Sequence, residues 1–311
     1  MTLYVGVDGG GSKTRVVAID GGGRVRLDAE TDGCDLPARG EASVRQVLRD
    51  VRGLVAGALG GADDAALALG LPAYGETGIW DEALDRLAAE IFAPWRYRVR
   101  NDVRLALEGA LPDSAGVLVL SGTGSMAWGK DDLGREARCG GWGTLLGDEG
   151  SGFDLGVGAL RAACRVEDGR GPVTALATEV PAALGVADMH GALALLSALP
   201  QPPRARVAAL ARTVVRVAEA GDAVAAALVD GAARELVDHV DALVARLALG
   251  EGAAVSTAGG GFHGAALAEA FADELTRRGY PAPRPPRYPP AFGGALLAGL
   301  APARLEAGFH D

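Results

Sequence analysis

The feature that most constrains the fold is a glycine-rich turn between two apolar runs near the start of the chain. Residues 3–7 (LYVGV) and 15–20 (RVVAID) are rich in β-branched side chains, and residues 8–14 (DGGGSKT) join them. Such a pattern predicts a β-hairpin. Three consecutive glycines remove the side chains from the turn, so its N–H groups can approach an anion closely. The chain therefore begins with a candidate phosphate site.

The polar residues around this turn suit a nucleotide with a divalent cation. Asp8 ends the first apolar run, where a carboxylate can bind a metal or hold its water shell. An ordinary hairpin with a capping aspartate would have the same sequence, so the turn alone does not establish a function. The predicted phosphate-binding residues are Gly9, Gly10, Gly11, Ser12, Lys13 and Thr14.

Composition narrows the class of protein. A chain of 311 residues that is 49% hydrophobic can form a sizeable core and two domains. A net charge of −10 (30 basic minus 40 acidic residues) argues against a nucleic-acid partner. No apolar run approaches the length of a membrane span, and the three widely spaced cysteines indicate reduced thiols. We therefore expect a cytoplasmic protein with no nucleic-acid or membrane partner.

The region after the hairpin alternates between strand and helix patterns. Its order, β-β-β-α-β-α-β, predicts an α/β unit with a mixed sheet. Asn101 and Asp102 fall where a strand ends and a helix begins, so Asp102 is either a helix N-cap or a functional carboxylate. The predicted elements are strands at 24–30, 66–71 and 97–100 and helices at 41–59, 80–92 and 103–111.

The opening pattern then recurs. Residues 116–120 (GVLVL) form a second apolar run, and 126–129 follow a turn made only of glycine and hydroxyl residues. Two such turns would supply backbone and hydroxyl donors to one polyphosphate. Pro112 precedes the repeat and marks the expected boundary between domains at 1–112 and 113–311. The second predicted phosphate turn consists of Ser121, Gly122, Thr123, Gly124 and Ser125.

A glycine-rich block at residues 139–152 (CGGWGTLLGDEGSG) completes a set of four motifs. Together with the two turns and the Asn101–Asp102 strand end, it resembles the N-acetylglucosamine kinases and the wider BadF/BadG-type ATPase group of the actin, sugar kinase and Hsp70 superfamily. The resemblance covers nearly the whole chain. It implies an α/β protein of two actin-like, ribonuclease H-like domains, the second larger and with a helical insertion, and a nucleotide cleft between them.

The resemblance also implies roles for individual residues. Asp8 corresponds to the magnesium-organising carboxylate and Asp102 to the catalytic base, while the two glycine turns bind ATP phosphates. The glycines Gly259, Gly260 and Gly261 correspond to the adenosine loop. They also satisfy a Gly-x-Gly-x-x-Gly pattern, which is weak evidence alone. The residues implied to bind substrate are Asp35, Asn101, Trp142, Gly143 and Asp148.

Some of these residues also fit plain structural roles. Trp142 could be a core tryptophan and Asp148 a helix cap. The resemblance puts an asparagine where this chain has Asp35, and a carboxylate there could favour a free amine over an acetamido group. The expected reaction is phosphorylation of the 6-hydroxyl of N-acetylglucosamine or glucosamine by ATP with Mg²⁺. The alternatives are an ATPase that activates a partner enzyme and a sugar-sensing regulator; a homodimer is compatible with each.

The rest of the second half is expected to be packing. Residues 173–249 are Ala-rich and helical in pattern, with breaks at Gly185, 200–203 and Gly221. A further strand is predicted before the Gly259 loop, and a helix follows the loop. Residues 280–290 are proline-rich and unsuited to a strand, and a last helix opens near Pro290.

Overall fold

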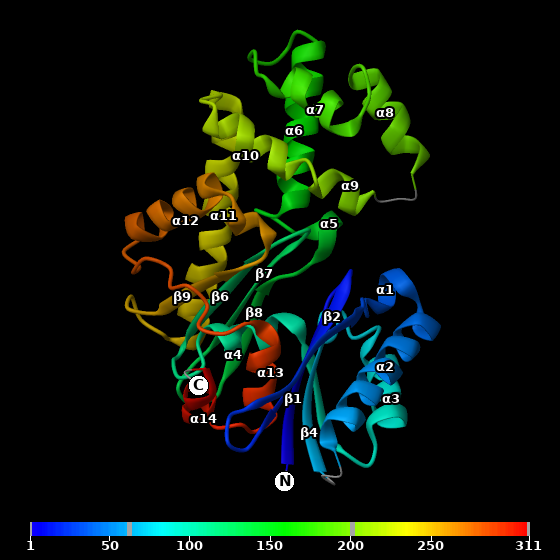
Figure 1. Cartoon of the computed structure of the whole chain (residues 1–311). Helices are drawn as coiled ribbons and strands as arrows, with labels where there is room; N and C mark the ends of the chain where they lie inside the picture. Colours follow the sequence, from blue (N-terminus) through cyan, green and yellow to red (C-terminus); the bar gives the residue numbers. More distant parts are fainter. Residues whose placement is uncertain (1, 61–63, 200–202, 310–311) are drawn as a thin grey trace. The chain divides into compact units, whose positions relative to one another are not determined.

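A computed structural model describes residues 2–60, 64–199 and 203–309, and it divides the chain into two compact units. The first unit comprises the residues up to Ser114 together with those from Pro285 onward, and the second comprises Ala115–Arg284. Figure 1 shows the elements of both units along the chain. Each unit has its own sheet and its own hydrophobic core, so we describe them separately.

The first unit is built on a five-stranded sheet of order β3-β2-β1-β4-β5. β1 pairs antiparallel with β2, and β2 with β3, which confirms the predicted hairpin and third strand. β4 and β5 run parallel to β1, as helical crossover connections require. The carboxyl ends of β1, β4 and β5 therefore lie at one edge. The strands are β1 (Thr2–Gly9), β2 (Lys13–Asp20), β3 (Val25–Asp32), β4 (Asp64–Leu71) and β5 (Arg96–Asn101).

Alternate residues of β1 face different helices. Leu3, Val5 and Val7 are fully buried in a core that includes residues of α2 and α3. Tyr4 points the other way and packs with residues of α13, because side chains alternate between the faces of a strand. The helices before the second unit are α1 (Leu36–Arg39), α2 (Glu41–Leu59), α3 (Asp81–Phe92) and α4 (Asp102–Ala110).

The C-terminal segment differs from the expectation. The predicted boundary at residue 112 assigns everything after it to the second domain, but α13 (Pro290–Leu297) and α14 (Pro302–Phe309) belong to the first unit. The reason is close packing of α13 on β1 and α4. A Cβ on Gly6 would overlap the Ala291 carbonyl oxygen, so only glycine permits this approach. Tyr288 N–H also donates to the Gly109 carbonyl over 2.9 Å.

The second unit repeats the strand pattern of the first. Its four-stranded sheet has the order β8-β7-β6-β9, with β6, β7 and β8 antiparallel and β9 parallel to β6. β8 was not among the predicted strands, because its five residues (EARCG) are half-exposed and lack apolar alternation. The strands are β6 (Gly116–Ser121), β7 (Ser125–Lys130), β8 (Glu136–Gly140) and β9 (Ala254–Ala258).

Helices make up the rest of the second unit, as predicted. The long helix α11 packs on β6, β7 and β8 through residues such as Leu236, Val240 and Leu243, all fully buried. α6 and α10 pack on α11, and α7 packs on α6 and α10, as Figure 1 shows. The helices are α5 (Gly143–Leu146), α6 (Gly152–Glu167), α7 (Leu176–Leu184), α8 (Met189–Ala198), α9 (Arg204–Ala208), α10 (Ala211–Glu219), α11 (Ala223–Leu247), η1 (Gly260–His263) and α12 (Ala265–Arg277).

Two further expectations can be compared with the structure. The sequence predicted no apolar run long enough to span a membrane. Residues Leu176–Ala198 nevertheless meet this criterion by length and composition. The structure divides them into α7 and α8, separated by Gly185 at φ 76°, and each is far shorter than the about 20 residues of a span. The breaks at Gly185 and Gly221 are confirmed, whereas residues 200–202 of the predicted break at 200–203 lie outside the described residues.

Candidate functional site

The first glycine turn is fixed by the loop that follows β3. Gly10 N–H donates to the Lys13 carbonyl across the turn, and Cys34 N–H donates to the Gly10 carbonyl, each over 3.0 Å. Arg39 Nε donates to the Gly11 carbonyl over 3.1 Å. These bonds fix the backbone of the turn at the carboxyl edge of the sheet. Gly11 and Ser12 remain exposed there, where a ligand could contact them.

Two of the predicted phosphate-binding side chains point elsewhere. Thr14 is fully buried and pairs with Gly9 in the β1–β2 ladder, so its hydroxyl faces Cys34 inside the protein. Burial is the main reason why the pKa of the Cys34 thiol is raised to about 11. Lys13 Nζ pairs with Glu30 Oε1 at 2.5 Å on the exposed face of β2 and β3. An exposed pair of this kind is weak, so the ammonium is free to change partner.

The structure brings Asp8 and Asp102 to the same strand-end edge. Asp8 is opposite Gly70 in the parallel β1–β4 ladder, and a Cβ on Gly70 would lie 3.2 Å from the Asp102 Cα. Burial raises the pKa of Asp102 to about 7, and the negative charges of Asp8 and Glu76 add to this. Burial also raises the pKa of Asp8 to about 6, although Arg15 and Lys13 oppose the shift. Two partly buried carboxylates with raised pKa values are typical of a functional site.

Asn101, rather than Asp102, is the N-cap of α4. Its Oδ1 accepts the Val103 N–H over 3.0 Å, and its Nδ2 donates to the Tyr74 carbonyl (3.0 Å) and to Glu76 Oε1 (3.3 Å). The amide is 2% exposed and its donors and acceptor are used within the protein. The structure thus gives Asn101 a positioning role: it fixes the first residue of the helix, which is Asp102.

Asp35 lies beside the first turn. It is the N-cap of α1 but makes no capping hydrogen bond, and its Oδ2 lies 3.9 Å from where a Cβ on Gly11 would be. Gly33 allows this contact, since a Cβ there would overlap the Gly11 carbonyl. Among the described residues the Asp35 carboxylate has no hydrogen-bond donor. It is available to a ligand at the turn.

The hydroxyls of the second turn hold a neighbouring loop. Ser121 Oγ donates to the Gly150 carbonyl over 2.9 Å, and Ser125 Oγ donates to the Glu149 carbonyl over 2.6 Å. Both serines are buried, so they shape the turn and do not face solvent. Thr123 is exposed at its tip, and within the described part of the chain its hydroxyl has no partner. Thr123 is therefore the side chain of this turn that a phosphate could contact.

A cavity of about 770 Å³ in the second unit joins the second turn to the predicted adenosine loop. β6 and β9 are parallel, so the turn after Ser121 and the loop after Ala258 leave the sheet at one edge. Gly122 and Thr123 line the cavity on one side, and Gly260 and Gly261 on another. Its remaining lining is Gly152, Leu155, Ala205, Ala208, Ala209, Ala211, Arg212, Val215, Arg216, Glu219, His263 and Gly264.

The predicted sugar residues of the second unit differ in exposure. Trp142 is 63% exposed, with the Arg138 guanidinium 5.4 Å from its ring centroid, so it is not a core tryptophan. Gly143 follows it with φ 77°. The Asp148 side chain is 3% exposed and does not cap α6, a role that Ser151 fills. Burial raises the pKa of Asp148, while Arg204 and the Ser125 N–H oppose the shift.

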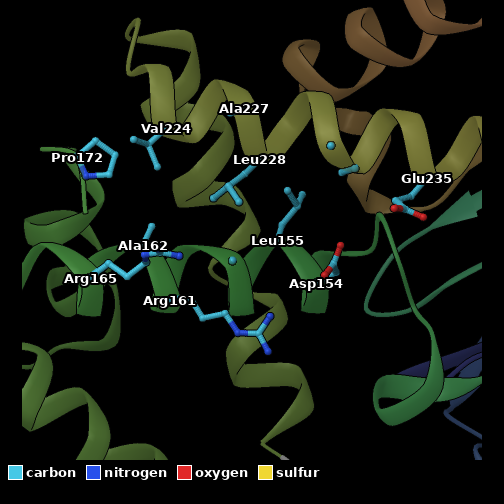
Figure 2. Close-up of a pocket in the computed structure, with 13 residues that line it drawn as sticks. Asp154, Leu155, Arg161, Ala162, Arg165, Pro172, Val224, Ala227, Leu228 and Glu235 are labelled. Carbon is cyan, nitrogen blue, oxygen red and sulfur yellow. The ribbon is translucent and has the colours of Figure 1, made fainter. Parts of the chain in front are cut away.

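A second cavity lies between α6 and α11, with a volume of about 480 Å³ (Figure 2). Arg161 and Arg165 come from α6, and Leu228 and Glu235 from α11. None of the residues predicted from the sequence lines it. The predicted nucleotide-binding residues Gly122, Thr123, Gly260 and Gly261 instead line the cavity of about 770 Å³.

Two residues near these sites, Glu76 and Arg204, belong to none of the motifs found in the sequence. Glu76 lies in the turn after β4 and accepts from Asn101; its position after a parallel strand was the only available signal. Arg204 opens α9 and its Nη2 donates to Asp148 Oδ2 over 2.9 Å. The two partners are 56 residues apart in the chain, and no local pattern connects them.

The donor set fits magnesium held jointly by protein and nucleotide. Among the described residues no three His, Cys, Asp or Glu side chains cluster as a metal site. Magnesium commonly uses one or two carboxylates together with substrate phosphates and water, so a full protein cage is not required. The Asp8 carboxylate is mostly buried and has no hydrogen-bond donor among the described residues. A cation would compensate that charge.

Comparisons with known proteins identify the family of this chain. The model of the BadF/BadG/BcrA/BcrD ATPase family matches residues 5–298. An N-acetylmuramic acid/N-acetylglucosamine kinase of Clostridium acetobutylicum is 31% identical, over 84% of this chain and 85% of that protein. An N-acetyl-D-glucosamine kinase of Dictyostelium discoideum is 27% identical, over 79% and 81%. A solved structure from Chromobacterium violaceum, provisionally described as an N-acetylglucosamine kinase, superposes with a TM-score of 0.74 at 26% identity and covers 94% of this chain and 98% of its own.

The fold and the two glycine turns define a two-domain, actin-like phosphotransferase, with mixed sheets built on one repeated strand pattern. Within that class, the chain belongs to the BadF/BadG/BcrA/BcrD ATPase family. The predicted family and fold class are confirmed.

Proposed function

We propose that this protein is an ATP-dependent kinase that transfers a phosphoryl group to the 6-hydroxyl of an amino sugar, N-acetylglucosamine or glucosamine. The Clostridium acetobutylicum and Dictyostelium discoideum relatives are sugar kinases, and both are named for N-acetylated amino sugars. The observation that carries the proposal is Asp102, a partly buried carboxylate with a raised pKa that directly follows β5, at the edge where the parallel strands β1, β4 and β5 end. A base of that kind is what a sugar hydroxyl needs in order to attack a phosphate.

In the proposed reaction Asp102 accepts the proton of the attacking hydroxyl. The exposed residues Gly11 and Ser12 of the first turn and Thr123 of the second would donate to phosphate oxygens, which would stabilise charge on the transferred group. Asp8 would hold Mg²⁺, which when bound neutralises charge on the phosphates. The cavity beside Gly260 and Gly261 would hold adenosine against bare backbone.

The candidate sugar-binding residues offer two kinds of contact. The exposed indole of Trp142 can cover the apolar face of a pyranose, and Gly143 leaves room beside it. Asp35 would supply a carboxylate, which can accept hydrogen bonds from two hydroxyls or from an ammonium. Asp148 is buried and already accepts from Ser125 N–H and Arg204, so it is not assigned to the sugar. Asn101 would act by positioning Asp102.

Steady-state release of ADP tests the proposal. The purified protein is incubated with Mg²⁺-ATP and, in turn, N-acetylglucosamine, glucosamine, N-acetylmuramic acid and glucose, and the product is identified by mass and by phosphorus NMR. We expect sugar-dependent ADP release and a 6-phosphate of an amino sugar. Equal ATP turnover with and without every sugar would contradict the kinase and favour the partner-activating ATPase.

Replacement of Asp35 by asparagine is expected to change the choice of sugar. An amide prefers an acetamido group, whereas a carboxylate prefers an ammonium, so the ratio of kcat/KM for N-acetylglucosamine over glucosamine should rise by about tenfold. The control is Asp32→Asn, which removes the same charge from an exposed position nearby. An unchanged ratio would show that Asp35 does not contact the amino group.

Replacement of Asp8 by asparagine is expected to weaken magnesium binding. The Mg²⁺ concentration that half-maximally stabilises the ADP-bound protein, followed by thermal unfolding, should rise by about tenfold or more. The readout does not depend on turnover. The control is Asp28→Asn, since Asp28 pairs with Arg15 on the exposed strand surface. Equal effects in both variants would indicate a general loss of charge rather than a ligand at Asp8.

A further inference from the structure

The guanidinium of Arg204 lies on the second glycine turn. A Cβ on Gly124 would overlap Arg204 Nη2 and would lie 2.6 Å from Asp148 Oδ1. The absence of a side chain at Gly124 therefore leaves the space that the Arg204–Asp148 pair occupies. The positively charged Arg204 guanidinium therefore contacts a turn that consists of glycine and hydroxyl residues.

Asp148 anchors this arginine. One carboxylate oxygen accepts the Ser125 N–H over 3.2 Å and the other accepts Arg204 Nη2 over 2.9 Å. Asp148 also has φ 61°, a left-handed conformation that is unfavourable for a residue with a Cβ. Backbone strain at a buried carboxylate is typical of functional sites, where the surrounding structure maintains it.

Arg204 itself remains open to solvent. Its side chain is 46% exposed while that of Asp148 is 3% exposed, so the pair has one buried and one exposed partner. A guanidinium has five N–H donors. The hydrogen bonds among described residues use the Nη2 group alone. The remaining donors are fixed in direction by Asp148 and are available to an anion.

The order of residues along the turn indicates which anion Arg204 would bind. Gly122 and Thr123 line the 770 Å³ cavity, whereas Arg204 lies at Gly124, farther along the same turn. A nucleotide whose nucleoside fills the cavity and whose phosphates follow the turn would bring its terminal phosphate to Gly124. α9 contributes to both places, because Ala205 and Ala208 line the cavity.

We propose that Arg204 is a catalytic residue that binds the terminal, transferred phosphoryl group of ATP, and that Asp148 holds its guanidinium in place. This inference rests on the proposed function for the identity of the nucleotide. A preorganised guanidinium stabilises the charge on a phosphoryl group in transfer, and it does so without exchanging a proton. A role limited to neutralising Asp148 would need neither the exposure of Arg204 nor its contact with Gly124.

Nucleotide affinity separates these roles. Isothermal titration with Mg²⁺ and either ADP or a non-hydrolysable ATP analogue is carried out on the wild type, Arg204→Gln and Arg204→Lys, with Arg170→Gln as control, since Arg170 pairs with Asp168 on the surface. We expect Arg204→Gln to lose about tenfold in affinity for the ATP analogue and less than twofold for ADP. Arg204→Lys should lose less, because the charge is kept, and the control should match the wild type.

Turnover gives the second readout. Arg204→Gln should lower kcat for sugar phosphorylation by about a hundredfold or more with the KM for sugar within threefold. Gly124→Ala, which displaces the guanidinium and leaves the arginine in the chain, should give the same loss of preference for the ATP analogue. An equal loss for ADP and the ATP analogue, no loss for either, or a raised sugar KM at unchanged kcat would overturn the inference. A wild type that binds nucleotide but phosphorylates no sugar would instead overturn the proposed function.

Discussion

Replacement of Asp102 by asparagine is expected to lower kcat for sugar phosphorylation by about a thousandfold while the affinity for ADP changes by less than twofold. Asparagine keeps the volume of the side chain but cannot accept the hydroxyl proton, and the loss of a positioned general base costs about 10²- to 10⁴-fold. Steady-state ADP release measures kcat, and titration with ADP measures the affinity.

A matched control distinguishes this effect from a general change of charge. Glu82→Gln removes one carboxylate from the exposed first turn of α3 in the same unit, and it should leave kcat within twofold. Retention of wild-type turnover by Asp102→Asn would remove this residue from the proposed role. The kinase itself would then be judged on the sugar dependence of ADP release.

The same variant should be more stable than the wild type at high pH. Burial raises the pKa of Asp102 from 3.8 to about 7 in the folded protein, so its ionisation costs folding free energy as the pH rises through this range. Asparagine has no charge to bury. In metal-free protein, the free energy of unfolding of Asp102→Asn should exceed that of the wild type by about 2–4 kcal/mol at pH 8 and should be equal to it near pH 4. A variant that is less stable at pH 8 would contradict the burial of an ionised carboxylate.

The sequence predicted those parts of the candidate site that depend on local pattern. Both glycine turns join antiparallel strands as expected, and Asp8 and Asp102 fall at one sheet edge. The reason is that strand ends and tight turns are set by neighbours in the chain, through β-branched runs and glycine. The parallel order of the strands then brings their carboxyl ends together.

Contacts between segments that are distant in the chain could not be predicted from local sequence patterns. The pairing of Lys13 with Glu30, the contact of Arg204 with Asp148 and the docking of α13 beside β1 join segments that are distant in the chain, and no spacing rule connects them. Asn101 illustrates the same limit. Its place at a strand end was visible in the sequence, and its N-cap bond with Val103 is local, whereas its hydrogen bonds to Tyr74 and Glu76 depend on the turn after β4.

The Gly259–Gly261 loop provides a prediction in which neighbouring glycines serve as controls for one another. Gly259 has φ 93°, and a Cβ there would overlap the Ser121 carbonyl at the base of the second turn. Gly259→Ala is therefore expected to lower the free energy of unfolding by about 3 kcal/mol, from left-handed backbone strain and steric overlap together. Denaturant unfolding followed by circular dichroism measures the change.

Gly260→Ala should behave differently, because a Cβ on Gly260 has no atom within 4 Å and Gly260 lines the cavity. The variant should unfold within about 0.5 kcal/mol of the wild type. Its added methyl group would enter the space proposed for adenosine, so its affinity for ADP should fall by about tenfold. Normal ADP binding by Gly260→Ala would place the nucleoside elsewhere. Loss of stability in Gly260→Ala equal to that in Gly259→Ala would contradict the open space at the loop. If Gly260→Ala keeps its stability but binds ADP more weakly, the nucleotide must contact the backbone of this loop.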